Sequence, residues 1–387
     1  MKFNQYTWNL YKQTVIGIEM IKYFSDARGY ALFKDYCLHA NFIPEDLYND
    51  WLENIYCYSV SDYDHPTSLE EAKGLYISLI TLGIRVEEQQ WLPANDFKNM
   101  LEIIQPMSYV LSQFAPEYFF PYLFLCRIFE LNKIADFFNI DLPNIPKRTD
   151  YKGRCMYYWE LCEVLYLFRK ENGLSPAELW SFLYDFAPNN LPSKKIDIPK
   201  PSQVWLIGGR LCQEDKSLES KFWQSSPDTK KGDILVHYET SPISAVTCIE
   251  ISLTDGVIDP LFRYYGCIYI GNRIAIPHIT LKEFREDEYF SSHPLIRKNF
   301  QGVNGWSMSS EDYSELLRMI KAKGFDIDTL PKLYTPTLPK NVSIEKERDV
   351  ELQLLEPLLN SMGWYENKDF IRQLPIHAGR GHRIFPD

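Results

Sequence analysis

The sequence has no hydrophobic run long enough to cross a membrane. Its longest apolar stretches, Leu75–Ile84 and Tyr118–Phe129, are shorter than the roughly 20 residues that a bilayer-spanning helix requires. Pro121 also interrupts the second stretch. The first residues show no charged start followed by an apolar segment, so we expect no secretion signal. These absences predict a protein without a membrane segment.

Paired cysteines and repeats are missing as well. The eight cysteines are scattered, with no CxxC pair and no histidine at zinc-ligand spacing. This pattern argues against a zinc module or a disulfide scaffold and predicts reduced, buried cysteines in a cytoplasmic protein. No segment recurs at a fixed period, which disfavours a solenoid.

Positive charge is scarce, and it is scarcest in the first half of the chain. The net charge is −11. Residues 1–198 carry 18 basic and 26 acidic side chains (−8), residues 199–325 carry 15 and 16 (−1), and residues 326–387 carry 8 and 10 (−2). Because polyanion binding needs clustered Lys and Arg, a nucleic-acid site is expected in the second half. The acidic first half favours contact with a partner protein.

The chain of 387 residues is too long for one hydrophobic core, so two or three domains are expected. Residues 1–198 have apolar side chains at mixed spacings of three and four, which predicts helices. Ser175, Pro176 and Glu178 form a capping box that opens a helix through Phe186. Other helices are predicted at Tyr11–Phe24, Pro44–Ile55, Leu69–Leu82, Asp96–Phe114, Tyr122–Phe138 and Tyr157–Lys170.

From Gln203 the pattern changes to short strands rich in β-branched and aromatic residues. Turn signals such as Asp255-Gly256 and Gly271-Asn272 separate them, which favours a small barrel. His237 lies in an apolar run and is expected to be a core histidine. Ser309 should cap a helix that runs through Ile320. The predicted strands are Val204–Gly209, Ile234–Tyr238, Ile243–Ser252, Gly266–Ile270 and Ile274–Ile276.

The chain ends in a periodic helix followed by a strand pair. Projected at 100° per residue, one apolar stripe contains Glu351, and Glu347 lies at its edge. A carboxylate on a buried face is costly unless it is paired or binds a metal. With Asp387 after the last strand, this arrangement predicts a divalent-cation site. The stripe consists of Val350, Leu354, Leu355, Leu358 and Met362.

Residues 199–325 resemble the EVE domain of the PUA-like superfamily. The resemblance implies a barrel whose pocket takes one nucleobase, often a modified one. Trp205, Trp223 and Tyr238 are then candidates for pocket walls that stack on the base, with ordinary barrel core as the alternative for each; Trp223, after a polar loop, should be the most exposed. Arg297 is a candidate phosphate contact. The matching residues are Val204-Trp205, Phe222-Trp223, Lys231-Gly232-Asp233-Ile234, His237-Tyr238, Ser244-Ala245-Val246, Asp259-Pro260, Ile276-Pro277-His278-Ile279-Thr280-Leu281, Pro294-Leu295-Ile296-Arg297 and Glu311-Asp312-Tyr313.

The last 44 residues, 344–387, resemble the start of the PD-(D/E)xK nuclease domain of type I restriction enzyme R proteins. The resemblance implies that Asp387 is the metal-binding and catalytic Asp, and that Glu347 is the helix carboxylate, with Glu351 as a weaker substitute. It implies Mg²⁺ as cofactor, because hard carboxylate oxygens bind it and the metal activates water. Arg380 and Arg383 would approach phosphates. The matching residues are Glu347–Glu351, Leu354–Leu359, Met362-Gly363-Trp364, Gly379–Arg383 and Pro386-Asp387.

The Glu-x-Lys half of such a site would lie beyond Asp387, so this chain alone is expected not to cleave. We expect a multidomain α+β protein with a helical domain (1–198), an EVE-like β-barrel (199–325), a linker (326–343) and the start of a nuclease domain (344–387). The leading interpretation is a restriction or defence endonuclease component that binds nucleic acid, DNA rather than RNA. The alternative is a non-catalytic module that reads a modified base, with a helical domain that binds a partner protein.

Overall fold

The computed structural model describes residues 3–26, 52–53, 60–82, 85–87, 90–91, 96–125, 127–191, 198–210, 220–334, 342–362, 364–371, 376–377 and 383–384. None of the helices in these ranges is long and apolar enough to span a bilayer. The chain divides into two compact units. The helical unit is Met1–Lys194 together with Val257–Gly266, and the sheet unit is Lys195–Gly256 together with Cys267–Asp387.

The helical unit is built largely from the helices that the sequence predicts. The helix predicted at Leu69–Leu82 has those bounds, Asp96 caps the next helix, and the capping box of Ser175 and Glu178 is present. The helix predicted at 44–55 lies mostly outside the described residues. The observed helices are α1 Gln5–Tyr11, α2 Val15–Asp26, α5 Leu69–Leu82, α6 Phe97–Phe114, α7 Ile128–Phe138, α8 Tyr151–Glu171, α9 Pro176–Ser181, a π-helix Phe182–Phe186 and α10 Ala187–Asn190, with short strands β1 Arg85–Glu87 and β2 Gln90–Trp91.

One predicted helix is shorter than expected. The helix predicted from Tyr122 begins only at Ile128, and the residues before it are extended and buried. Buried side chains satisfy the extended backbone: the Ser108 hydroxyl accepts from the Tyr122 N–H, and the Tyr184 hydroxyl donates to the Pro121 carbonyl. The segment therefore crosses the core without helical hydrogen bonds.

A loop that interrupts the sheet in the sequence belongs to the helical unit. Arg154, on α8, has no exposed surface. Its guanidinium donates to the carbonyl oxygens of Pro260 at 2.8 Å and Phe262 at 2.7 Å. The Tyr265 hydroxyl donates to the Pro146 carbonyl at 2.5 Å. Residues 257–266 are thus held by the helical unit's own core.

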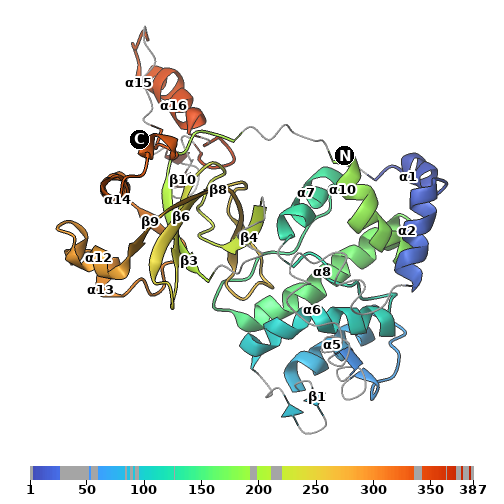
Figure 1. The fold of residues 1–387 in the computed structure, drawn as a ribbon. Coiled ribbons are helices and arrows are strands. Elements are labelled where there is room, and N and C mark those ends of the chain that lie inside the picture. Colours follow the sequence, from blue (N-terminus) through green and yellow to red (C-terminus); the bar gives the residue numbers. More distant parts are fainter. Residues whose placement is uncertain are drawn as a thin grey trace. The chain divides into compact units, whose positions relative to one another are not determined.

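The sheet unit has a curled, mixed sheet with strand order β4-β8-β6-β5-β3-β9 (Figure 1). Strands β3 and β5 are parallel and begin in register at Val204 and Ile234, while the other neighbours along this order are antiparallel. The strands are β3 Val204–Gly209, β4 Ser220–Gln224, β5 Ile234–Glu239, β6 Ala245–Ser252, β8 Gly266–Thr280 and β9 Trp306–Met308; the short strand β7 Val257–Ile258 belongs to the helical unit.

The hairpin turn predicted at Gly271-Asn272 is wrong. Residues 266–280 form one long strand, β8, instead of two. Asn272 has a positive φ of 52°, and the pairing with β6 shifts register between Ile249 and Ile251. The turn signal therefore marks a bulge, at which an extra residue bends a strand without ending it.

Helices cover one face of the sheet. These are α12 Leu281–Glu286, α13 Pro294–Arg297 and α14 Ser310–Ala322, which Figure 1 shows on the same side of the strands. Ser309 caps α14 as predicted. Their apolar residues form the main core with Leu206, Val236 and Tyr238. The opposite face, here called the tryptophan face, carries Trp205, Ile207, Leu235, Ile268, Ile270 and Trp223.

The C-terminal part of the sheet unit has the predicted helix and strand pair. The helix is α15 Glu347–Val350, a π-helical turn Glu351–Leu355 and α16 Glu356–Ser361; strands β10 Ile376–His377 and β11 Arg383–Ile384 pair antiparallel. Lys230 forms an ion pair with Asp369 and lies 4.6 Å from the Trp364 ring centroid, and Lys368 pairs with Asp255 at 2.8 Å. These contacts attach the segment after the helix to the loops of the sheet.

Candidate functional site

The structure separates the three predicted base-binding residues. Trp205 is 5% exposed, and its indole N–H donates to Asp233 at 2.8 Å. Tyr238 is 3% exposed and stacks on Phe300, with ring centroids 4.2 Å apart, on the helix-covered face. Trp223 lies half-buried on the tryptophan face with Trp205. Because side chains alternate along a strand, Tyr238 points away from the other two.

Polar side chains gather beside Trp223. We call Lys221, His237, Glu239, Cys248 and Glu250 the buried polar cluster, since each is at most 5% exposed. They come from three strands: Lys221 from β4, His237 and Glu239 from β5, and Cys248 and Glu250 from β6. So many polar groups out of water are costly unless they are paired or serve a ligand.

Glu250 is the centre of this cluster. Its carboxylate is 3.0 Å from His237 Nδ1 and 3.4 Å from Lys221 Nζ. The Trp223 ring lies beside both of these partners, with its centroid 4.8 Å from the His237 ring and 5.0 Å from Lys221 Nζ. Gly209 leaves the space for Trp223, because a Cβ there would lie 2.4 Å from the indole. A glycine is thus required at this point of β3.

The charges in the cluster decide its hydrogen-bond pattern. Burial alone would raise the pKa of Glu250, but the hydrogen bond from His237 and the positive charges of Lys221 and Arg273 outweigh it, so the pKa is lowered. Glu250 is therefore ionised and can only accept hydrogen bonds. In the tautomer that donates its Nδ1–H to Glu250, His237 presents Nε2 as an acceptor.

Several polar atoms of this region lack a hydrogen-bond partner within the described part of the chain. They include His237 Nε2, Lys221 Nζ, the Trp223 indole nitrogen and Arg273 Nη1. A buried group without a partner costs about 1–3 kcal/mol. The set offers an acceptor on His237 and donors on Lys221 and Trp223. It is therefore suited to a ligand edge that presents a donor next to an acceptor.

His237, Cys248 and Glu250 have potential metal-ligand atoms within 4.8 Å of one another. Burial, and secondarily the charge of Glu250, raises the pKa of the Cys248 thiol to about 12. A metal ion would have to displace the thiol proton, because metals bind the thiolate. Lys221 places a positive charge 3.4 Å from Glu250. Mg²⁺ in particular prefers several oxygen ligands, and of these three residues only Glu250 supplies oxygen.

The predicted Mg²⁺ site at the C-terminus is described only in part. Glu347 is exposed in the first turn of α15, and Glu351 is half-buried at the start of the π-helical turn. Asp387 and Arg380 lie outside the described residues, and of Arg383 only the backbone, in β11, is described. Among the described residues, Glu347 and Glu351 belong to no group of three potential ligands. The site stays a prediction.

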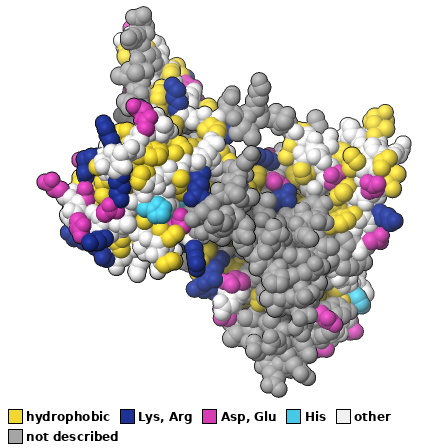
Figure 2. Space-filling view, viewed as in Figure 1, with side chains coloured by type: hydrophobic (Ala, Val, Ile, Leu, Met, Phe, Trp, Pro, Cys, Tyr) yellow, Lys and Arg dark blue, Asp and Glu magenta, His cyan; other side chains and the backbone are white. Residues whose placement is uncertain are grey.

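Arg297, the predicted phosphate contact, is exposed at the last residue of α13. Figure 2 shows basic and acidic side chains interspersed over this part of the molecule. The geometry therefore permits a phosphate contact at Arg297 but surrounds it with mixed charge, which weakens long-range attraction of a polyanion.

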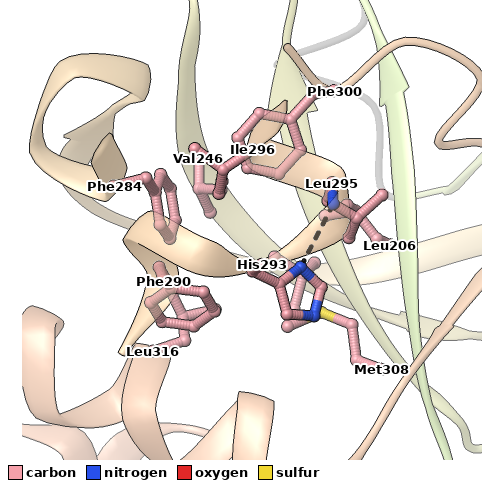
Figure 3. A pocket seen from close by; sticks show the side chains of 11 residues that line it. Leu206, Val246, Phe284, Phe290, His293, Leu295, Ile296, Phe300, Met308 and Leu316 are labelled. Carbon is pink, nitrogen blue, oxygen red and sulfur yellow. Dashed lines mark hydrogen bonds between the residues drawn. The ribbon is translucent and has the colours of Figure 1, made fainter. Parts of the chain in front are cut away.

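A second hollow in the sheet unit is part of its core. It lies under α12 and α13 and is lined mostly by apolar side chains such as Phe284, Phe290 and Phe300 (Figure 3). His293 is partnered there: its Nδ1 accepts from the Leu295 N–H, and Nε2 is 3.3 Å from Asp312. The cavity of about 10 Å³ is too small to hold a ligand.

Sequence reasoning missed most of the buried polar cluster. Lys221, Glu239 and Glu250 were not singled out, and His237 was expected to be an ordinary core residue. The signal was present: His237 and Glu239 alternate with the apolar Val236 and Tyr238 along one strand. That alternation normally indicates a solvent-facing polar side, so it does not by itself reveal burial.

Comparisons with known proteins add little to this geometry. The sequence matches no protein-family model, and no curated protein matches it. Three solved structures resemble parts of the chain. Rpa0253 from Rhodopseudomonas palustris is 13% identical with a TM-score of 0.28 and covers 31% of this chain and 94% of its own. A hypothetical protein from Leishmania major is 13% identical with a TM-score of 0.26 and covers 32% of this chain and 98% of its own. Atu2648 from Agrobacterium tumefaciens is 15% identical with a TM-score of 0.26 and covers 30% of this chain and 92% of its own. Such low scores carry no conclusion about fold or function.

Proposed function

We propose that the sheet unit binds nucleic acid by receiving one unpaired or extruded base at the tryptophan face. The observation that carries the proposal is the buried polar cluster next to Trp223. A nucleobase has a flat apolar surface and an edge of adjacent donors and acceptors. Trp223 supplies a flat partner, and Lys221 with His237 supplies a donor and an acceptor.

The ligand class follows from the balance of charges. Lys221 and Glu250 are already paired, so the site does not demand a charged ligand. A neutral, planar, polar-edged molecule fits this environment better than a free phosphate. Phosphates of the flanking nucleotides would lie at the rim, with Arg297 as the candidate contact. DNA is favoured over RNA, and the helical unit would contact a partner protein.

The wider role that we infer is that of a cytoplasmic restriction or defence component whose base-binding unit selects the target. Phosphodiester cleavage would need Mg²⁺ held by Asp387 and Glu347, with Glu351 as a substitute, and a Glu-x-Lys strand after residue 387. This part rests on the sequence resemblance alone. Base binding without cleavage is the alternative, and it needs only the residues of the tryptophan face.

The test is binding of the full chain to single-stranded oligonucleotides of about 12 nucleotides, as DNA and RNA, with and without a modified cytosine. We expect Trp223→Ala to weaken binding about 5- to 100-fold, because a stacked base contributes about 1–3 kcal/mol. Trp306→Ala is the matched control, since Trp306 is also half-buried but packs against the core on the helix-covered face. Equal affinities for both variants would contradict the proposed site.

A further inference from the structure

A pocket lies in the helical unit, and it shares no residue with the proposed base site. Its volume is about 320 Å³, at the lower end of the range for small-molecule sites. One wall is α6, another is the extended segment before α7, and the third is the loop 257–266. Its apolar lining includes Leu101, Leu125, Leu261 and Phe262, with the rings of Tyr122 and Tyr264.

The third wall is preformed. The Arg154 guanidinium holds the carbonyls of Pro260 and Phe262. Asp259, fully buried, accepts from the Leu261 N–H at 2.9 Å and lies 3.4 Å from the Tyr122 hydroxyl. A rigid wall costs little ordering entropy when a ligand binds, so a compact ligand can bind usefully here.

The polar character of the pocket comes mainly from one ion pair. Glu102 Oε1 and Arg263 Nη1 are 2.7 Å apart, and the two side chains are 47% and 53% exposed. Each uses one atom in this contact. Because about half of each side chain is exposed, the second carboxylate oxygen and the remaining guanidinium N–H groups can bind further groups without breaking the pair. A cation would add to Glu102 and an anion to Arg263.

The surroundings select against a ligand of either net charge. Residues 1–198 carry a net charge of −8 (18 basic, 26 acidic), which repels anions. Arg263 at the mouth repels a simple cation. A molecule that presents an ammonium and a carboxylate on neighbouring atoms satisfies both members of the pair and brings no net charge. The rest of such a molecule must be apolar to fill the lining.

We propose that this pocket binds a free α-amino acid with a large apolar or aromatic side chain. Its ammonium pairs with Glu102, its carboxylate pairs with Arg263, and its side chain packs among Leu101, Leu261 and Phe262. The proposal is independent of the base site, because no residue is shared between them.

The experiment is calorimetric titration of the full chain with L-phenylalanine, then L-leucine and L-tyrosine. We expect binding with a dissociation constant below about 1 mM. Arg263→Gln and Glu102→Gln should each weaken it at least about tenfold. Arg318→Gln is the matched control, because Arg318 forms an ion pair of similar exposure with Glu315 in the sheet unit, and it should change nothing.

Two analogues make the test independent of how the variants fold. Phenethylamine keeps only the ammonium, and 3-phenylpropionate keeps only the carboxylate, so each should bind the unaltered chain at least about tenfold more weakly than L-phenylalanine. Arg263→Gln should spare the amine, and Glu102→Gln should spare the acid. Failure of all three amino acids to bind, or equal binding of L-phenylalanine and both analogues, would overturn the proposal.

Discussion

Asp233 is a carboxylate kept out of water at the start of β5. Asp233 is 1% exposed. Its carboxylate accepts hydrogen bonds from the Trp205 indole N–H and the Lys230 backbone N–H, both at 2.8 Å. Burial raises its pKa to about 6, because the hydrogen bonds from Lys230, Trp205 and their neighbours offset only part of the desolvation. At neutral pH this residue is therefore a buried charge.

The pH dependence of stability follows from this shift. The pKa is raised above the ordinary 3.8, so between these values the folded chain holds a proton that the unfolded chain releases. The contribution of Asp233 is fully present below pH 3.8 and is lost as pH rises through about 6. We expect the unfolding free energy of the wild type relative to Asp233→Asn to fall by about 3 kcal/mol between about pH 4 and pH 7.

Urea unfolding of both proteins across that pH range measures this difference. Asp228→Asn, which removes a carboxylate at an exposed position on the preceding turn, is the control for the loss of one negative charge. Parallel pH profiles for the wild type and Asp233→Asn would contradict the predicted linkage.

At the scale of single elements, helix starts are the features that local sequence specifies best. Ser309 accepts from the Asp312 N–H at 3.0 Å, and Asp312 accepts from the Ser309 N–H at 2.8 Å. The two residues of this capping box are three positions apart in the sequence, so no distant contact is needed to form it. The bend in β8 is the opposite case, because the strand continues past Asn272 only where Gly271 and Ile274, on either side of it, pair with β6.

Adjacent serines allow a direct test of the α14 cap. Ser309→Ala should lower the unfolding free energy of the sheet unit by about 1 kcal/mol, because the Asp312 N–H loses its acceptor. Ser310→Ala, one residue later, removes a hydroxyl that does not cap the helix and should change it by less than about 0.5 kcal/mol. The two changes are compared by chemical denaturation; equal effects would mean that the cap does not stabilise α14.

At the scale of the whole molecule, the chain passes between its two units more than once. The helical unit includes residues 257–266, which lie between two segments of the sheet unit in the sequence. Arg154 holds residues 257–266 in the helical unit. Its guanidinium lies 5.3 Å from the Tyr151 ring and 5.2 Å from the Tyr265 ring. A fragment that ends at residue 194 would therefore lack residues 257–266, which are part of the helical unit's core.

Arg154→Lys tests this anchoring. A lysine keeps the charge but cannot donate to several carbonyls at once, so we expect the helical unit to lose about 3 kcal/mol of stability. Limited proteolysis within 257–266 should become faster. Arg148→Lys, at an exposed arginine that contributes only its carbonyl to Arg154, should leave both measurements unchanged. Wild-type behaviour of Arg154→Lys would show that the loop is held by other contacts.

Features set by local sequence could be predicted for the fold and the site, and features set by distant contacts could not. Strand Val204–Gly209 and helix Leu69–Leu82 were predicted with their observed bounds, because their patterns are continuous and bounded by turn residues. Trp223 was expected to be the most exposed of three aromatic candidates, and it is half-buried while Trp205 and Tyr238 are buried. The neighbours of Trp223 were not predicted, since Lys221 and Glu250 meet only after three strands pair.

Short-range chemistry was enough to define helix caps, most strand positions and the change from helices to strands near residue 200, because these depend on residues a few positions apart. The tertiary fold alone decided which face of each strand is buried and where β8 bends. It also decided the attachment of 257–266 to the helical unit, the buried polar cluster and the pocket of the helical unit. The physical reason is that burial and charge pairing depend on side chains far apart in the chain, and no local sequence pattern predicts which of them come into contact.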